Sequence, residues 1–461
     1  MPADAETVFN SLGARYEAAF GMDRELQRFI ELAAKVLPSR SRVLDVGCGT
    51  GKPVSHTLAS AGHEVHGIDI SQEMVTIAGL QVAGDFQVAD MRTYQPSELF
   101  DAVFAILSLF QMPSSDVCSI VVRFSQWIKV GGYLVLGVTP STALDPEKVT
   151  YDSTWDCALM LDKPWMGNLI DDSFLSEERW SQLLRESGFA IEIQPVSYLF
   201  SPSGPDHSPE AHYLLMAKKI EQEPLLGPYP LPRCLKPSIL SRTGDLLTHN
   251  LVSKDLERLL EAIEDSEKVL CIGKDLIGGR FQRHKSRFLN TPLEDSLFLP
   301  GTFSTVLALW QLDNLLDMER AIQQMTRLVS GLDSKIVVVQ GGPYNEVVQL
   351  LTSVTRSAPV GHQGHLLHSA IQYLAKYGFG DINLHRIDAH YEFQEENCLE
   401  RCTTAADFLT GIWHKQHFQH ELIKKALIPR LQLRFRSDAN MVSHGMVAIV
   451  ARPFPNQGKS T

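Results

Sequence analysis

The stretch Val43-Leu44-Asp45-Val46-Gly47-Cys48-Gly49-Thr50-Gly51 joins a short apolar run to a turn with three glycines. The apolar run predicts a buried strand, and the glycines let the backbone turn tightly and let its N–H groups approach a ligand with no Cβ in the way. A second strand is predicted at 64–68, and Asp69 follows it directly. This order predicts a nucleoside-binding site.

The spacing of the glycines separates the ligand classes that use such a turn. A phosphate-binding P-loop has four residues between its glycines and then Lys with Ser or Thr. Here three residues separate Gly47 from Gly51, and Pro53 occupies the position where a P-loop has the Ser or Thr hydroxyl. A dinucleotide-binding turn needs a third small residue at the position that Lys52 occupies. The remaining pattern, Asp-x-Gly-x-Gly-x-Gly over 45–51, favours a cofactor that brings no pyrophosphate to the turn.

Strands and helices alternate along the first half of the chain, which predicts an α/β fold with a parallel sheet covered on both faces. Helices are predicted at 27–36 and 177–187, and strands at 42–46, 64–68, 85–88, 100–106 and 133–138. The segment that follows residue 138 is interpreted as a loop. Strands at 190–198 and 212–217, with a polar loop between them, predict an antiparallel hairpin at the end of this first domain, which covers 1–220.

Prolines are dense directly after this domain. Five of them lie between 221 and 238, which excludes a helix or a central strand and predicts a stiff linker over 221–240. The same order of elements then repeats over 241–455, which predicts a second domain of the same fold. Its strands are predicted at 268–272, 303–309, 335–340, 382–390 and 446–451, and its helices at 256–263, 318–329 and 361–377.

The glycine turn of the second domain, 273–279, lacks the spacing of the first. Lys274 and Asp275 place side chains where such a turn needs an exposed backbone, and no acidic residue clearly ends the next strand. Two interpretations stay open: a degenerate copy that has lost its cofactor, which we favour, or a divergent domain of another kind.

Composition restricts the partners and the location of this chain. Its 461 residues carry a net charge of −12, which offers no electrostatic footprint for a nucleic-acid backbone. The N-terminus lacks a secretory pattern, and no apolar run approaches the ~20 residues that a bilayer requires. Seven scattered cysteines suit reduced intracellular thiols. We therefore expect a cytoplasmic protein that acts on neither nucleic acid nor membrane.

Residues 16–219 resemble the class I S-adenosylmethionine (SAM)-dependent methyltransferases, on the glycine turn, Asp69 and the segment Val88-Ala89-Asp90-Met91 taken in order. The resemblance implies that SAM is the cofactor. It implies that the turn passes under the methionine part of SAM, that Asp69 accepts from both ribose hydroxyls, and that Asp90 and Met91 hold the adenine. The cofactor-binding residues implied are Asp45, Gly47, Cys48, Gly49, Gly51, Asp69, Ile70, Asp90, Met91 and Leu107.

Each acid also has a purely structural interpretation. Asp45 could be an ordinary acid at the end of a strand, Asp69 could cap the helix that begins near Ser71, and Asp90 could be a turn residue. The order and spacing of all three favour the cofactor site.

Aromatic and histidine side chains are the candidates for the acceptor site, and no catalytic base is identified. The candidates are Tyr16 in an N-terminal helix, Trp155 and Trp165 in the loop after Val138, and His207 or His212 near the last hairpin. Tyr16 resembles a residue that closes over the cofactor in related enzymes, but it could equally pack on the sheet.

Histidines also recur at a spacing of three in the second half, at 362, 365 and 368 and again at 414, 417 and 420, with Cys398 and Cys402 between the two sets. The first and third members of such a set have drifted apart around a helix, and zinc sites show tighter ligand sets. We therefore predict no metal.

The leading hypothesis is a SAM-dependent methyltransferase that acts on N or O of a small molecule or a modified peptide. A complete domain followed by a decayed copy is similar to the two-domain methyltransferases of fungal secondary metabolism, which implies a mycotoxin-type pathway. Two alternatives are a SAM-binding cyclase or pericyclase that transfers no methyl group, and a SAM-binding scaffold that is not an enzyme.

Overall fold

The computed structural model divides the chain into two compact units, Met1–Pro230 and Leu231–Thr461, called here the N-terminal and C-terminal units. It describes residues 4–152, 155–203, 208–227, 251–264, 268–272, 287–289, 298–315, 317–354, 363–414, 419–437 and 440–454. Most of the predicted linker and all of the second glycine turn, 273–279, lie outside the described residues.

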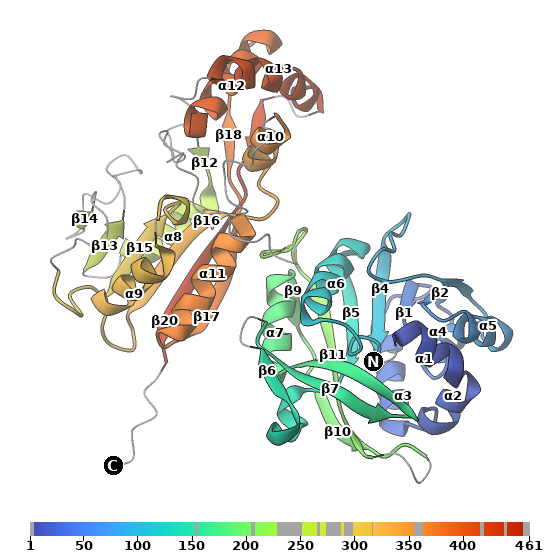
Figure 1. Cartoon of the computed structure of the whole chain (residues 1–461). Helices are drawn as coiled ribbons and strands as arrows, with labels where there is room; N and C mark the ends of the chain where they lie inside the picture. The colour runs from blue at the N-terminus through green and yellow to red at the C-terminus, as the bar shows by residue number, and fades with distance from the viewer. Residues whose placement is uncertain are drawn as a thin grey trace, which may run out of the picture. The chain divides into compact units, whose positions relative to one another are not determined.

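A mixed sheet forms the centre of the N-terminal unit (Figure 1). Its strand order is β10-β11-β5-β4-β1-β2-β3, with β9 also paired to β11. The strands from β3 to β5 in this order are parallel, whereas β11 runs antiparallel to each of its neighbours. The bounds are β1 (Arg42–Val46), β2 (Glu64–Asp69), β3 (Asp85–Val88), β4 (Phe100–Ile106), β5 (Ile128–Val138), β9 (Phe189–Ile191), β10 (Val196–Phe200) and β11 (Glu210–Lys219). The predicted parallel sheet with an antiparallel end is confirmed.

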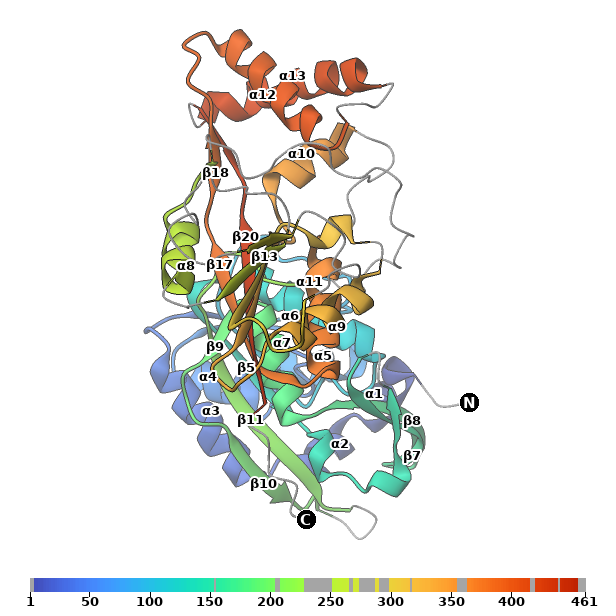
Figure 2. The same cartoon turned by 90° about the vertical axis from the view of Figure 1, so that its left-hand side faces the viewer.

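Helices pack around this sheet (Figures 1 and 2). They are α1 (Ala5–Leu12), α2 (Ala14–Phe20), α3 (Arg24–Val36), α4 (Val54–Ser60), α5 (Gln72–Gln81), α6 (Ser114–Trp127) and α7 (Glu177–Glu186). Helix α3 begins where Asp23 accepts a hydrogen bond from the Leu26 N–H, as expected of an N-cap. Its apolar face places Ile30 in one buried cluster with Val43 of β1 and Phe104 of β4, so the amphipathic pattern of the sequence fixes this face of the sheet.

The segment after Val138 is not a loop, and the prediction was wrong there. It forms a separate antiparallel sheet of β6 (Thr150–Asp152), β7 (Cys157–Trp165) and β8 (Asn168–Leu175). A register shift between Met160 and Lys163 breaks the alternation that would have marked these strands in the sequence. The single strand predicted at 190–198 is likewise two strands, β9 and β10, which pair with different parts of β11.

The β7–β8 hairpin packs against the N-terminal helices. Trp165 and Ile170 share a buried cluster with Val8 and Leu12 of α1 and Phe20 of α2. Figures 1 and 2 both show the hairpin running toward α2. The contact places α1 and β8 in the walls of the pocket described below.

The C-terminal unit has its own six-stranded sheet, with the order β14-β13-β15-β16-β20-β17. Strands β14, β13, β15 and β16 are parallel, and β20 runs antiparallel to β16 and β17. The bounds are β13 (Val269–Ile272), β14 (Arg287–Leu289), β15 (Thr305–Leu309), β16 (Lys335–Gly341), β17 (Phe379–Ile387) and β20 (Met446–Pro453), with helices α8 (Lys254–Glu264), α9 (Met318–Leu328) and α11 (Gln363–Lys376). The strands and helices predicted here are confirmed, although the strand predicted to reach residue 390 ends at Ile387.

A helical group at one end of this sheet was not predicted. It comprises α10 (Glu346–Val354), α12 (Cys398–His414) and α13 (His420–Ser437). A small sheet of β12 (Leu251–Val252), β18 (His390–Glu392) and β19 (Met441–Ser443) accompanies it. Both views place this group beyond one end of the six-stranded sheet (Figures 1 and 2). No helix in the described parts of either unit is long and apolar enough to cross a membrane.

Candidate active site

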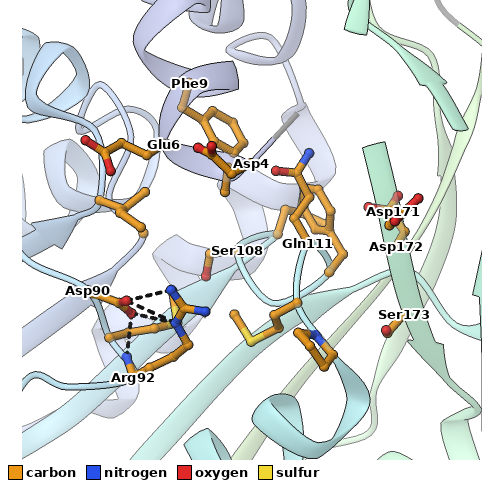
Figure 3. A pocket seen from close by; sticks show the side chains of 18 of the residues that line it. Asp4, Glu6, Phe9, Asp90, Arg92, Ser108, Gln111, Asp171, Asp172 and Ser173 are labelled. Atoms are coloured by element: carbon orange, nitrogen blue, oxygen red, sulfur yellow. Dashed lines mark hydrogen bonds and ion pairs between the residues drawn. The ribbon is translucent and has the colours of Figure 1, made fainter. Parts of the chain in front are cut away.

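A pocket of about 730 Å³ opens at the carboxyl ends of β1, β2 and β4, where open α/β sheets bind their ligands. Helix α1, the loop after β4 and strand β8 complete its walls (Figure 3). The predicted residues that line it are Tyr16, Gly47, Gly49, Asp69, Ile70, Asp90, Met91, Leu107 and Trp155.

A second, smaller cavity of about 40 Å³ shares Tyr16, Gly47, Gly49 and Leu107 with the first pocket. Asp45, Cys48 and His212 line only this smaller cavity. Gly51 and Trp165 line neither of the two.

The glycine turn needs its glycines for two different reasons. Gly47 has φ +70°, and a Cβ there would lie 2.4 Å from the Cβ of Ser108, so a side chain at this position collides with the loop after β4. Gly51 has φ +84°, and a Cβ there would lie 2.9 Å from Val82 at the end of α5. Gly47 thus keeps the pocket wall bare, whereas Gly51 allows close packing behind it.

Asp69 presents a buried carboxylate at the end of β2. The backbone N–H of Gly49 donates to its Oδ2, and the N–H of Ser71 donates to its Oδ1, both at 2.9 Å. Burial raises the pKa of this carboxyl, and the two backbone hydrogen bonds oppose the rise. Each oxygen keeps a further lone pair for a ligand, and the carboxylate also fixes the turn to the second strand.

Asp45 points away from the large pocket. Its side chain is 1% exposed and accepts a 2.6 Å hydrogen bond from the Ser55 hydroxyl of α4. Burial raises the pKa of Asp45 to about 7, partly opposed by Ser55, while nearby Asp69 raises it further. Asp45 therefore ties the helix after the turn to the strand before it.

Asp90 is held by its own neighbour. Arg92 donates to both carboxylate oxygens through Nε and Nη2, at 3.0 and 2.7 Å, and the Arg92 backbone N–H donates at 2.8 Å. These contacts lower the pKa of Asp90. The same guanidinium lies 3.8 Å from Asp116 of α6, so the acid at this position is ionised and fixed in direction (Figure 3).

The end of β4 is tightly held. Leu107 has φ +53°, a left-handed conformation that is unfavourable for a leucine, and its N–H donates to the Gly137 carbonyl at 2.7 Å. The Ser108 hydroxyl donates to the Val46 carbonyl at 2.8 Å. The strained Leu107 therefore turns the chain into the pocket at the end of β4. Hydrogen bonds to both neighbouring strands, β1 and β5, hold this turn.

The acceptor candidates separate into two groups. Tyr16 and Trp155 line the large pocket, and the Tyr16 ring lies 4.0 Å from the position of a Cβ at Gly49. Burial raises the pKa of the Tyr16 hydroxyl, as do nearby Glu210 and Asp69. Trp165 packs behind the wall and donates from Nε1 to Glu210 at 3.1 Å. His207 lies outside the described residues.

His212 belongs to a buried polar network behind the glycine turn. Its Nδ1 lies 3.1 Å from Asp23 Oδ2, and the Tyr198 hydroxyl donates to the same oxygen at 2.7 Å. Burial lowers the pKa of His212, but Asp23 and Glu210 outweigh it, and the net shift is upward. His212 therefore joins β11 to the start of α3 rather than entering the large pocket.

Sequence reasoning missed several pocket residues, among them Phe9 of α1, Gln111 in the loop after β4, and Asp172 of β8. Gln111 lies four residues after Leu107, which was predicted to bind the cofactor, so an extension of that segment could have found it. Asp172 had no such signal, because the strand that carries it was not predicted.

No cluster of three or more metal-binding side chains occurs in the described parts of the chain. His362 and His417 lie outside the described residues, as do the side chains of His365 and His414. His368 is buried, and His420 lies 3.9 Å from Asp407.

Known proteins resemble the N-terminal unit. Residues 43–132 match the family model described as "Methyltransferase domain". Methyltransferase GfsG of Streptomyces halstedii is 28% identical over 135 residues, which cover 28% of this chain and 46% of that protein. The 27-O-demethylrifamycin SV methyltransferase of Amycolatopsis mediterranei is 32% identical over 144 residues, covering 28% of this chain and 52% of that protein. The chain thus spans about half the length of these curated relatives.

Among solved structures, a SAM-dependent methyltransferase from Methanosarcina mazei aligns at 22% identity with a TM-score of 0.33. The alignment covers 41% of this chain and 97% of that one.

Proposed function

We propose that the N-terminal unit, in which residues 43–132 match the methyltransferase domain model, transfers a methyl group from SAM to N or O of a small molecule or a modified peptide. The relatives that match it are methyltransferases, and one is named for a rifamycin substrate. A role in secondary metabolism of the mycotoxin type follows from the resemblance to two-domain fungal enzymes and is part of this proposal.

The observation that carries the proposal is the placement of Asp69. Its carboxylate lies at the end of β2, lines the large pocket, and is already oriented by two backbone N–H groups. A carboxylate fixed in this way suits the two adjacent hydroxyls of a ribose.

The other residues of the proposed SAM site fall on either side of Asp69. Gly47, Gly49, Cys48 and Leu107 would face the methionine part, with Asp45 and Gly51 supporting the turn from behind. Ile70, Asp90 and Met91 would hold the adenine, with Asp90 already oriented by Arg92. When bound, SAM supplies a methyl group on a sulfonium, and the protein contributes alignment of the acceptor in a partly buried pocket.

The C-terminal unit is proposed to be a degenerate copy of the same fold. Its strand order β14-β13-β15-β16-β20-β17 corresponds to β2-β1-β4-β5-β11-β10 of the N-terminal unit. The proposal therefore predicts one SAM site per chain.

Calorimetry with the full chain tests the cofactor site, and we expect one SAM bound per chain. The reaction is tested by comparing the metabolites of cells with and without the protein. In cells without it, one compound should be replaced by a form that is lighter by a single methyl group. Release of S-adenosylhomocysteine (SAH) with that product supports methyl transfer. SAM that binds but is never consumed would support the cyclase or scaffold alternatives, and a stoichiometry of two would refute degeneracy.

A further inference from the structure

The acceptor side of the pocket is strongly acidic. Seven carboxylates line the pocket, and Arg92 is the one basic side chain among the described lining residues. That guanidinium already contacts Asp90 and Asp116. The carboxylates are those of Asp4, Glu6, Asp69, Asp90, Asp152, Asp171 and Asp172. The pocket therefore attracts positive charge, and four of these acids, Asp4, Glu6, Asp171 and Asp172, belong to the start of α1 and to β8.

Asp172 is the buried member of this set. Its side chain is fully buried, Lys163 Nζ donates to its Oδ2 at 2.8 Å, and its Oδ1 has no hydrogen-bond partner. Burial raises the pKa of Asp172, and Lys163 opposes the rise. A buried carboxylate oxygen without a partner is unfavourable unless a ligand supplies a donor.

Gln111 follows a residue that is bonded to the strand of Asp172, and it is also incompletely bonded. The Ser173 N–H donates to the Phe110 carbonyl at 3.0 Å, so Gln111 and Asp172 flank one bridge between the loop after β4 and strand β8. Neither amide atom of Gln111 has a partner, although both are buried. In Figure 3 the Gln111 amide projects into the pocket, in this view between Asp4 and the strand with Asp171 and Asp172.

Apolar side chains line the same pocket as these polar atoms. They are Phe9, Phe110, Met112, Trp155 and Leu161. Leu161 is 62% exposed, which is unusual for a leucine on a pocket wall and leaves apolar surface for a ligand.

We propose that the acceptor is an amphipathic amine, whose basic nitrogen donates hydrogen bonds to Asp172 Oδ1 and to the Gln111 amide oxygen while its apolar body packs on the surrounding aromatic side chains. This inference rests on the proposed function and names the substrate class of the same pocket. Asp172 supplies the negative charge, and Gln111 supplies a second hydrogen-bond acceptor. For methyl transfer the ammonium group would first give one proton to the Asp172 carboxylate. The freed nitrogen lone pair would then form the N–CH3 bond as the S–CH3 bond of SAM breaks and SAH leaves.

Three probes that share one aromatic ring test the inference: 2-phenylethylamine, 2-phenylethanol and phenylacetate. Each is titrated against the full chain saturated with SAH, with binding followed by ligand-observed NMR. We expect the amine to bind roughly tenfold more tightly than the alcohol, because its hydrogen bonds are charge-assisted, and phenylacetate to bind most weakly. Equal binding of amine and alcohol would overturn the proposal.

Two variants assign the preference to these residues. Asp172→Asn should remove the advantage of the amine over the alcohol, and Gln111→Lys should shift the preference toward phenylacetate. Glu147→Gln is the matched control, because Glu147 is an exposed acid of the same unit that does not line the pocket. An amine preference that survives both variants would show that the other acids, which also face the positive charge of SAM, are its source.

SAH affinity measured in parallel separates the two proposals. Unchanged SAH binding in a variant shows that the unit is folded, and if Asp172→Asn fails this control, Gln111→Lys decides. A wild-type chain that binds neither SAM nor SAH would refute the proposed function, whereas one that binds SAH with no amine preference would refute only the substrate class.

Discussion

The ends of β4 and β15 hold the same place in the strand order of their two sheets. They have the same backbone conformation, but their side chains have different surroundings. After β4, Leu107 has φ +53° and donates to the carbonyl of Gly137 in β5, and it lines the large pocket. After β15, Trp310 has φ +49° and donates to the carbonyl of Val339 in β16. Its side chain, however, is 1% exposed and belongs to the core.

Further side chains seal this corner of the C-terminal unit. The Trp310 ring stacks on His444 with centroids 4.5 Å apart, and Tyr391 packs on the same histidine. Asn345 Nδ2 donates to His444 Nδ1 at 3.2 Å and to the Gly445 carbonyl at 2.7 Å. The comparison teaches that topology provides the strand end, and that the side chains placed there decide whether it is a pocket or core.

Removing the tryptophan should have the largest effect. Trp310→Ala leaves a large cavity in a packed core, which typically lowers the free energy of unfolding by about 3–5 kcal/mol. For a unit of this size that corresponds to a fall of roughly 6–20 °C in the thermal midpoint. Calorimetric scans should show the fall in the transition that SAH does not shift, because SAH raises only the transition of the unit that binds it.

Trp155→Ala is the control for this variant, because Trp155 lines the pocket of the N-terminal unit. It should leave the same transition unchanged. If Trp310→Ala instead weakened SAM binding without loss of stability, the corner around Trp310 would be part of a ligand site and the comparison would fail.

The opposite change adds a side-chain atom at the open strand ends of the N-terminal unit, where Gly47 faces Ser108. Gly47→Ala places a Cβ 2.4 Å from the Ser108 Cβ at a φ of +70°, and we expect SAM affinity to fall more than about 100-fold, or about 2.7 kcal/mol. Calorimetric titration measures this. Gly131→Ala is the matched control: its φ of +86° imposes similar backbone strain, but no atom lies within 4 Å of the added Cβ. It should cost about 1 kcal/mol of stability and no affinity.

Loss of the proposed ribose acceptor should have a smaller effect. Asp69→Ala removes charge-assisted hydrogen bonds worth ~1.5–3 kcal/mol, so SAM should bind about 10- to 100-fold more weakly. Asp85→Ala removes an exposed acid at the start of β3 and should leave the SAM affinity unchanged in the same titration. Unchanged affinity in the Asp69 variant would disprove the ribose assignment.

The smallest expected effect is a pH dependence of the N-terminal unit. Because the folded pKa of His212 is raised, its protonated form stabilises the fold fully below the unfolded pKa of ~6.5, and this contribution is lost as pH rises through the folded pKa. His212→Gln should therefore lower the SAH-sensitive thermal midpoint more at pH 6 than at pH 9. Asp23→Asn should reduce the same pH dependence, since it removes the carboxylate that lies 3.1 Å from the ring while Glu210 remains. A penalty independent of pH would exclude a charged His212.

The residues of the proposed cofactor site could be predicted from the sequence because their signals are local. Gly47, Gly49 and Asp69 act through backbone conformation and through their position at strand ends, and both leave a pattern of spacing in the sequence. Their meeting in one pocket followed from the parallel sheet, since adjacent parallel strands end at the same edge.

The residues of the proposed acceptor site could not be predicted from the sequence, because they become neighbours only through packing. Asp171 and Asp172 look like a solvated acidic pair, yet Asp171 is exposed and Asp172 is buried beside Lys163. The two side chains point to opposite faces of β8. The register shift in the β7–β8 hairpin removes the sequence pattern that would have indicated this strand. In the same way, the tryptophan that fills the second strand end follows a strand no different in pattern from β4.

The sequence by itself determined the order of most strands of the two main sheets, the glycine turn and the acid that faces it, because strand burial, glycine conformation and spacing are local properties of the chain. Only the tertiary structure decided that Asp45 turns to α4, that His212 joins Asp23 behind the turn, and that β8 brings Asp172 to Gln111. These contacts join residues distant in sequence, and their free energies depend on burial and on partners that no local pattern specifies.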